Sequence, residues 1–270
     1  MPELPEVETT RRGLAPHVER QKVTAVRIYD RRLRWPVPPR LATLLVGKTI
    51  DKIDRRSKYL LFHTTSGTLI VHFGMTGSLR IYERAPARRR HDHLDITFAN
   101  GALMRYHDPR RFGAVLWSPS HLSHPLLAAL GPEPLEPGFT GESLHDALRK
   151  RTGPIKPALM NSTVVVGVGN IYASEALFRA GIRPTRQANR LSRASCARIV
   201  SSIRDTLNDA VTRGGSTLRD YVGSNGEPGE SQFHHFVYGR AGKPCRVCGT
   251  PIRAARQAGR ATTYCAKCQR

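Results

Sequence analysis

The chain is 270 residues long and strongly basic, with 43 Lys and Arg residues against 21 Asp and Glu residues and a formal net charge of +22. A chain of this length has room for two domains that each bury a core, which excludes a miniature scaffold held by disulfides. The charge and a sequence pI near 10.8 favour a polyanionic partner, foremost nucleic acid. A basic protein without such a partner is the alternative that charge alone leaves open.

The first residues lack the pattern of a secretory signal, which is a basic stretch followed by an apolar run. The chain begins MPELPE, with prolines and acids where a signal peptide has its basic stretch and apolar run. No run approaches the roughly 18 uncharged apolar residues of a membrane span. We therefore expect a cytoplasmic protein that makes no contact with a membrane.

The N-terminal half predicts one helix followed by strands. Leu4, Val7, Leu14 and Val18 recur at nearly helical spacing, which predicts an amphipathic helix over 4–18. Short apolar runs then predict a β-rich domain, with strands near 23–29, 59–63, 68–73, 94–98, 103–106 and 114–117. The dipeptide Asn100-Gly101 suits the positive φ angles of a tight hairpin turn.

A proline-rich segment separates this domain from a helical one. Three prolines fall within 131–138, which disfavours both helix and sheet and marks a domain boundary. Beyond it, apolar residues recur every three or four positions over 191–211, so we expect a helix with Cys196 in the core. Gly214-Gly215 ends that helix, and 214–230, rich in Gly, Ser and Asn, is expected to be a mobile loop.

Four of the five cysteines lie near the C-terminus as two C-x-x-C pairs. Cys245, Cys248, Cys265 and Cys268 have the spacing C-x2-C-x16-C-x2-C, which is typical of a tetrahedral zinc site on a β-hairpin. Four thiolates leave no open coordination position, so the zinc is expected to be structural. A thioredoxin-like redox pair is the weaker alternative.

The residues around these cysteines are one-sidedly basic. No acid follows Glu230, whereas eight cations do: Arg240, Lys243, Arg246, Arg253, Arg256, Arg260, Lys267 and Arg270. Such a finger is expected to lie against phosphates, although a solvated charged face is the ordinary interpretation of a charge run.

Four long motifs resemble those of one enzyme family. They are PELPEVE at 2–8, RRSKYLL at 55–61, DPRRFG at 108–113 and VGVGNIYASE at 166–175. Together with the basic zinc finger, they make the chain similar to the bacterial formamidopyrimidine-DNA glycosylases over nearly its whole length. The resemblance implies an α+β multidomain protein with DNA in the cleft between its domains. These would be an N-terminal β-sandwich with its opening helix at 1–131, a linker at 132–138, a helix-two-turn-helix domain at 139–232 and a zinc finger at 233–270.

The resemblance also implies a nucleophile at Pro2, freed when Met1 is removed. An α-amino group titrates at about 7.7 to 8.0, so an appreciable fraction is unprotonated at neutral pH. Attack of this secondary amine on the sugar C1′ expels the base and leaves a charged iminium, a Schiff base that draws electrons during elimination of the phosphates. Glu3 matches the family's acid, which protonates the sugar ring oxygen.

Further positions match residues with family roles. Lys58 matches the lysine of β elimination and phosphate binding, and Arg260, near the tip of the zinc hairpin, matches the arginine of δ elimination. Met75, Arg110 and Phe112 match the trio that fills the stack after a damaged nucleotide is flipped out. His91, Arg151 and Asn170 match DNA contacts of the family, and Asn170 is also expected to be a helix N-cap. Residues 214–230 match the loop that closes over the extruded base.

The function that this resemblance implies is a bifunctional glycosylase and AP lyase of base excision repair, acting on oxidised purines in duplex DNA. It would be a monomer associated with the bacterial nucleoid, with one zinc ion and no organic cofactor. An endonuclease VIII type enzyme for oxidised pyrimidines is the nearest alternative, against which Leu4, Met75 and Phe112 argue. A non-catalytic zinc-ribbon DNA-binding protein would explain the charge and the cysteines but not the N-terminal motif.

Overall fold

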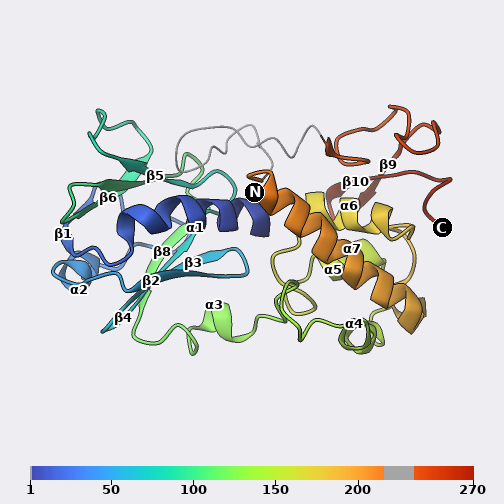
Figure 1. Cartoon of the computed structure of the whole chain (residues 1–270), viewed down its shortest axis with the longest axis horizontal. Coiled ribbons are helices and arrows are strands. Elements are labelled where there is room, and N and C mark those ends of the chain that lie inside the picture. Colours follow the sequence, from blue (N-terminus) through green and yellow to red (C-terminus); the bar gives the residue numbers. More distant parts are fainter. Residues whose placement is uncertain (1, 216–233) are drawn as a thin grey trace. The chain divides into compact units, whose positions relative to one another are not determined.

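The computed structural model describes residues 2–215 and 234–270, so nearly all of the predicted capping loop lies outside the described residues. The chain divides into two compact units (Figure 1). The first comprises Met1–Ala128 and Arg213–Glu230, and the second comprises Ala129–Thr212 and Ser231–Arg270.

The first unit opens with helix α1, Leu4–Val18, which confirms the predicted helix. Pro5 lies in its first turn, where the missing N–H costs no helical hydrogen bond. The Glu6 carboxylate accepts a hydrogen bond from the backbone N–H of Glu3 at 2.8 Å and so helps to cap the helix. The buried apolar face packs against strands β2, β3 and β5 and consists of Leu4, Val7, Leu14 and Val18.

Two four-stranded antiparallel sheets form the rest of this unit. One has the order β1-β6-β7-β5, with β1 Val23–Ile28, β6 Asp92–Phe98, β7 Leu103–His107 and β5 Ser78–Tyr82. The other has the order β2-β3-β4-β8, with β2 Lys52–Arg56, β3 Tyr59–Thr64, β4 Gly67–His72 and β8 Ala114–Ser118. A single apolar core contains residues of both sheets, such as Phe62 and Tyr106, so the unit is a β-sandwich. Two short helices complete the unit, α2 Leu41–Leu45 and α3 Pro125–Ala128.

The six predicted strands are all present, but the turn between β6 and β7 differs from the expected one. Only Gly101 has a positive φ, of 85°, whereas Asn100 does not. The Phe98 N–H bonds to the Ala102 carbonyl, and the Gly101 N–H bonds back to Phe98. The predicted hairpin is therefore present with a loop of three residues that requires a left-handed conformation at Gly101 alone, so the positive φ expected at Asn100 was wrong.

Helices dominate the second unit. They are α4 Gly141–Leu148, α5 Ile155–Leu159, α6 Asn170–Arg179, the short 3-10 helix η1 Ala188–Arg190 and α7 Arg193–Thr212. Helix α7 packs against α4 and α6 and confirms the helix predicted over 191–211, with Cys196 fully buried. The proline-rich residues 131–138 form neither helix nor strand.

The C-terminal part of this unit carries the hairpin β9 Arg253–Gln257 and β10 Arg260–Tyr264. A small core joins it to α6 through Phe178. The carboxylate of Glu175, on α6, accepts hydrogen bonds from three successive backbone N–H groups at 236–238. The finger is thus attached to the helical part by both apolar and polar contacts.

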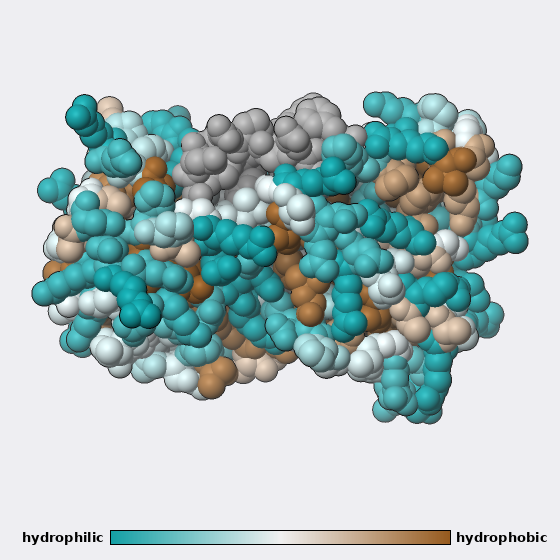
Figure 2. All heavy atoms as spheres, viewed as in Figure 1, coloured by the Kyte–Doolittle hydropathy of each residue, from teal (hydrophilic) through white to brown (hydrophobic). Residues whose placement is uncertain are grey.

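The part of the chain that the structure describes contains no helix with the length and apolar character to cross a membrane. The face drawn in Figure 2 is mainly hydrophilic, with small separated hydrophobic patches.

Candidate functional site

The N-terminal pair Pro2 and Glu3 lies immediately before the first turn of α1, and both residues are buried. Gly215 lies against this turn, because a Cβ added to it would be 3.1 Å from Oε1 of Glu6. Its φ of +79° also favours glycine. Gly215, the last described residue before the predicted capping loop, therefore lies against the first turn of the helix that Pro2 and Glu3 precede.

Lys58 lies in the turn between β2 and β3, close to His72 at the end of β4. Burial, together with the positive charges of Lys58 and Arg34, lowers the pKa of His72 to about 4. The ring is thus neutral at pH 7, and its Nδ1 accepts a hydrogen bond from the backbone N–H of Gly74 at 3.0 Å. This bond fixes the beginning of the loop 73–77, which carries Met75.

The loop 73–77 is fixed to the loop 108–113 by a buried carboxylate. Asp108 accepts hydrogen bonds from Oγ1 of Thr76 at 2.7 Å and from the backbone N–H groups of Arg110 at 3.2 Å and Gly113 at 2.9 Å. The two backbones touch, because a Cβ on Gly74 would lie 2.3 Å from the carbonyl carbon of Phe112. The DPRRFG motif therefore has a structural role in addition to the DNA contacts predicted for it.

These two loops expose the predicted trio. Met75 is 39% exposed and Phe112 is 44% exposed, unusual values for such large apolar side chains. The Arg110 guanidinium lies 4.7 Å from the centroid of the Phe112 ring. An apolar side chain, an aromatic ring and a cation held on rigid loops suit insertion between bases and pairing with an orphaned base.

His91 adjoins the same loops. Its carbonyl accepts a hydrogen bond from the backbone N–H of Asp108 at 3.1 Å. Its ring lies 6.1 Å from that of His107, and its Nδ1 is buried with no hydrogen-bond partner in the described part of the chain. The first unit thus brings His91, Arg110, Met75 and Phe112 together.

In the second unit, Asn170 is the first residue of α6 and not its cap. Gly169 occupies the N-cap position, so the N-cap prediction for Asn170 was wrong. The Asn170 side chain instead accepts a hydrogen bond from Nζ of Lys156 at 2.6 Å. Because the Asn170 side-chain oxygen accepts this bond from Lys156, the side-chain NH2 group of Asn170 remains able to donate hydrogen bonds to other groups.

Lys156 is a residue that the motifs did not reveal. It is 1% exposed, and its Nζ also donates to the carbonyl of Ala261 and to Oγ1 of Thr262, both at 2.9 Å. One buried cation therefore joins α5, α6 and β10. A sequence signal existed, since Lys156 is a lone charge within the apolar stretch PIKPAL.

Arg260 is exposed at the start of β10, directly before Ala261. The two-residue turn before it has positive φ at both Ala258 and Gly259, as a type I′ hairpin requires. A cavity of about 230 Å³ lies beside Arg260, lined also by Lys156, Met160 and Gln257. Lys156 thus fixes the strand that carries Arg260.

Arg151 lies just after α4, within the helical part. Its guanidinium donates to Oγ1 of Thr163 at 3.1 Å and to the carbonyl of Ala147 at 3.3 Å. These two partners hold the side chain against the end of α4 and the loop that follows α5.

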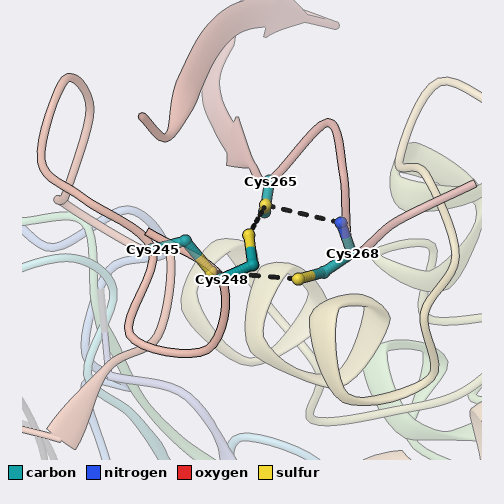
Figure 3. A group of neighbouring side chains, drawn as sticks. All are labelled: Cys245, Cys248, Cys265 and Cys268. Carbon is teal, nitrogen blue, oxygen red and sulfur yellow. Dashed lines mark hydrogen bonds between the residues drawn. The ribbon is translucent and has the colours of Figure 1, made fainter. Parts of the chain in front are cut away.

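The four predicted cysteines form one cluster (Figure 3). Their sulfur atoms all lie within 4.8 Å of one another. Hydrogen bonds from Thr250 lower the pKa of Cys248 to about 6, whereas burial and the neighbouring sulfurs raise that of Cys268 to about 12. A divalent cation would remove the repulsion between four thiolates, so the donor set fits one structural zinc ion.

Comparison with known proteins identifies the family of the chain. The Formamidopyrimidine-DNA glycosylase N-terminal domain family matches residues 1–115, its H2TH domain matches 130–222, and the zinc finger found in FPG and IleRS matches 242–270. The chain is 54% identical to the formamidopyrimidine-DNA glycosylase of Stutzerimonas stutzeri, with 100% of both chains covered.

Solved structures agree with this match. The chain is similar to Lactococcus lactis Fpg in complex with DNA that contains an abasic site, at 37% identity and a TM-score of 0.90 with 99% of both chains covered. It is equally similar to MutM in complex with DNA that contains carbocyclic 8-oxo-G, at 37% identity and a TM-score of 0.90 with 100% of both chains covered. The chain belongs to the formamidopyrimidine-DNA glycosylase family.

Proposed function

We propose that this protein is a base excision repair glycosylase that removes oxidised purines from duplex DNA and then cuts the strand by β and δ elimination. The observation that carries the proposal is the similarity over the whole chain to formamidopyrimidine-DNA glycosylases. Relatives bound to DNA with an abasic site or carbocyclic 8-oxo-G support the same substrate class.

The chemistry begins at Pro2 once Met1 has been removed. Its amine attacks C1′ of the damaged nucleotide, the glycosidic bond breaks, and the base leaves with its electron pair and a proton. The resulting iminium draws electrons as a proton leaves C2′ and the C3′–O bond breaks, and a second elimination breaks the C5′–O bond. Hydrolysis of the Schiff base then frees Pro2.

Other residues assist this nucleophile. Glu3, buried beside Pro2, protonates the sugar ring oxygen as the ring opens. Lys58 and Arg260 serve β and δ elimination, respectively, and bind the phosphates that leave. Met75, Arg110 and Phe112 fill the stack, and their fixed loops support this role. The remaining proposed DNA contacts are His91, Arg151 and Asn170.

The zinc ion would be held by Cys245, Cys248, Cys265 and Cys268 and would supply rigidity rather than chemistry. We further propose that the protein acts as a monomer in the cytoplasm, with damaged duplex DNA as its partner and without a membrane. The high positive charge supports DNA as the partner, because Lys and Arg that bind phosphates release counterions from the DNA.

Borohydride trapping tests the proposed reaction. Duplexes with 8-oxoguanine opposite cytosine and with an oxidised pyrimidine are incubated with the protein under conditions that trap a known glycosylase. A covalent adduct on the purine duplex is expected, and its absence would sink the catalytic proposal. A preference for the pyrimidine duplex would instead indicate the endonuclease VIII type.

Replacement of the nucleophile adds a second test. Pro2→Gly is expected to slow base excision greatly while salt-dependent DNA binding stays nearly intact, because glycine offers a primary amine without the proline ring. Equal activity of the variant and the unaltered protein would remove Pro2 from the mechanism.

A further inference from the structure

The connection between β5 and β6 carries an unusual density of positive charge. Residues 83–90, named here the arginine loop, read ERAPARRR and are all exposed. The loop contains four arginines and one acid, Glu83, which gives it a net charge of +3. None of the motifs that identify the family includes these residues.

The backbone of the arginine loop is nevertheless held in place. The Arg105 guanidinium donates to the carbonyl of Pro86 at 3.0 Å, and the backbone N–H of Arg89 donates to the Asp92 carboxylate at 2.7 Å. Arg105 is itself fixed by two hydrogen bonds of 2.7 Å to Asp95, and all three supporting side chains are buried. A long buried network therefore presents a short basic loop.

The charges on this loop are hardly neutralised by the protein. Arg105 and His107 already bind the carboxylate of Asp92. The Arg89 guanidinium reaches Asp92 only at 3.8 Å, and Arg84 and Arg90 have no ion pair within the described residues. Clustered exposed cations repel one another in the free protein, and this repulsion is relieved when they meet phosphates.

The position of the loop indicates which phosphates these are. Arg90 leads directly into His91, whose carbonyl binds the backbone N–H of Asp108. Asp108 organises the loop that exposes Arg110 and Phe112. The arginine loop thus continues, within one unit, the surface that carries the proposed DNA contacts.

We infer that the arginine loop is an additional DNA-binding surface that contacts duplex phosphates beyond those reached by His91 and Arg110. The inference rests on the proposed function, since it extends the same DNA-binding surface. Phosphate contacts carry no sequence information, so the loop raises affinity for undamaged and damaged duplex alike and lengthens the time available to search for lesions.

The test is the salt dependence of binding to an undamaged duplex. The slope of log K against log salt is negative, and each lost phosphate contact lowers its magnitude by about 0.9. The variant Arg84→Gln, Arg88→Gln, Arg89→Gln and Arg90→Gln is expected to lower it by about 2 to 4. Single-turnover excision at saturating protein is expected to stay within about twofold, because none of these residues takes part in the chemistry.

A matched variant separates local contact from net charge. Arg20, Lys22, Arg27 and Arg40 are exposed cations of the same unit, and their replacement by Gln removes the same charge. This control is expected to change the slope by less than about 1. The double variant Arg84→Gln and Arg90→Gln leaves the anchoring contacts untouched and is expected to lower the magnitude of the slope by about 1 to 2 even if the fourfold variant misfolds.

The outcomes distinguish the two proposals. Two results would overturn the role of the arginine loop. One is a salt slope in the double variant equal to that of the unaltered protein. The other is an equal loss of slope magnitude in the fourfold variant and in the control variant. If the unaltered protein excises no base from any lesion duplex, the proposed function fails, whatever the slopes are.

Discussion

Asn170 and Lys156 are joined by a hydrogen bond of 2.6 Å from the lysine ammonium to the amide oxygen. The same ammonium binds Ala261 and Thr262, so the start of α6 and the strand that follows Arg260 share one buried cation. Two proposed DNA-contacting residues are thereby positioned by a third that need not touch DNA.

Replacement of this cation is expected to affect both stability and activity. Lys156→Met roughly keeps the length of the side chain but leaves three acceptors without their donor, of which that of Thr262 is buried, at a cost of about 2 to 5 kcal/mol in the free energy of unfolding. Excision is expected to fall further than stability explains, because Arg260 loses its support. Urea unfolding and single-turnover excision, both at a temperature where the variant is folded, measure the two effects.

Lys150→Met is the matched control, since Lys150 is exposed in the same unit. It is expected to change the free energy of unfolding by less than about 0.5 kcal/mol. If Lys156→Met excises at the rate of the unaltered protein, Lys156 does not position Arg260.

The contrast between Lys156 and the predicted residues indicates what the sequence can and cannot provide. Strands such as β3 and β4 were predicted because their apolar runs reflect burial. Strands β2 and β5 were missed because they lie at sheet edges and contain charged residues.

For the candidate site, too, some features could be predicted from the sequence and others could not. Motif positions such as Arg110 and Phe112 were predicted, but the contacts that hold them were not. Asp108 reaches Thr76 across 32 residues, and Lys156 reaches Thr262 across 106. Such partners depend on tertiary packing, which periodicity and spacing do not encode.

Zinc removal is expected to unfold the finger. Cys265→Ser, or a strong chelator, should release about one zinc ion per chain and expose the small core around Val237 and Ile252. Metal analysis and hydrogen exchange at 243–270 measure this. Cys196→Ala is the matched control, because Cys196 is buried in α7 outside the cluster, and it is expected to retain full zinc content. A zinc-free protein with an unchanged exchange pattern in the finger would contradict a structural role.

Replacement of Phe112, one of the three exposed residues proposed to fill the stack, is expected to lower activity without lowering stability. Phe112→Ala removes a ring that is 44% exposed, so the free energy of unfolding is expected to change by less than about 1 kcal/mol. Excision from a lesion duplex is expected to fall about 5- to 150-fold, since stacking on a base contributes about 1 to 3 kcal/mol. Leu122→Ala removes another exposed apolar side chain of the same unit and serves as the control. Equal excision by both variants would exclude Phe112 as a stacking residue.

His72 predicts a pH dependence of stability. Its pKa is about 4 in the folded protein and about 6.5 when unfolded, so the unfolded state binds more protons between these values. The free energy of unfolding therefore falls as the pH drops from about 6.5 to 4, by about 1 to 3 kcal/mol after allowance for partial exposure. Protonation also removes the acceptor for the Gly74 N–H and loosens the loop that carries Met75.

His72→Asn isolates this effect, because the amide oxygen of Asn takes the place of Nδ1 as an acceptor but does not titrate. Urea unfolding of both proteins at pH 7.5, 6 and 5 is compared, so that contributions of other histidines and of carboxylates cancel in the difference. The unaltered protein is expected to lose stability relative to the variant as the pH falls. A difference between the two proteins that does not change with pH would show that His72 is protonated as readily in the folded state as in the unfolded chain.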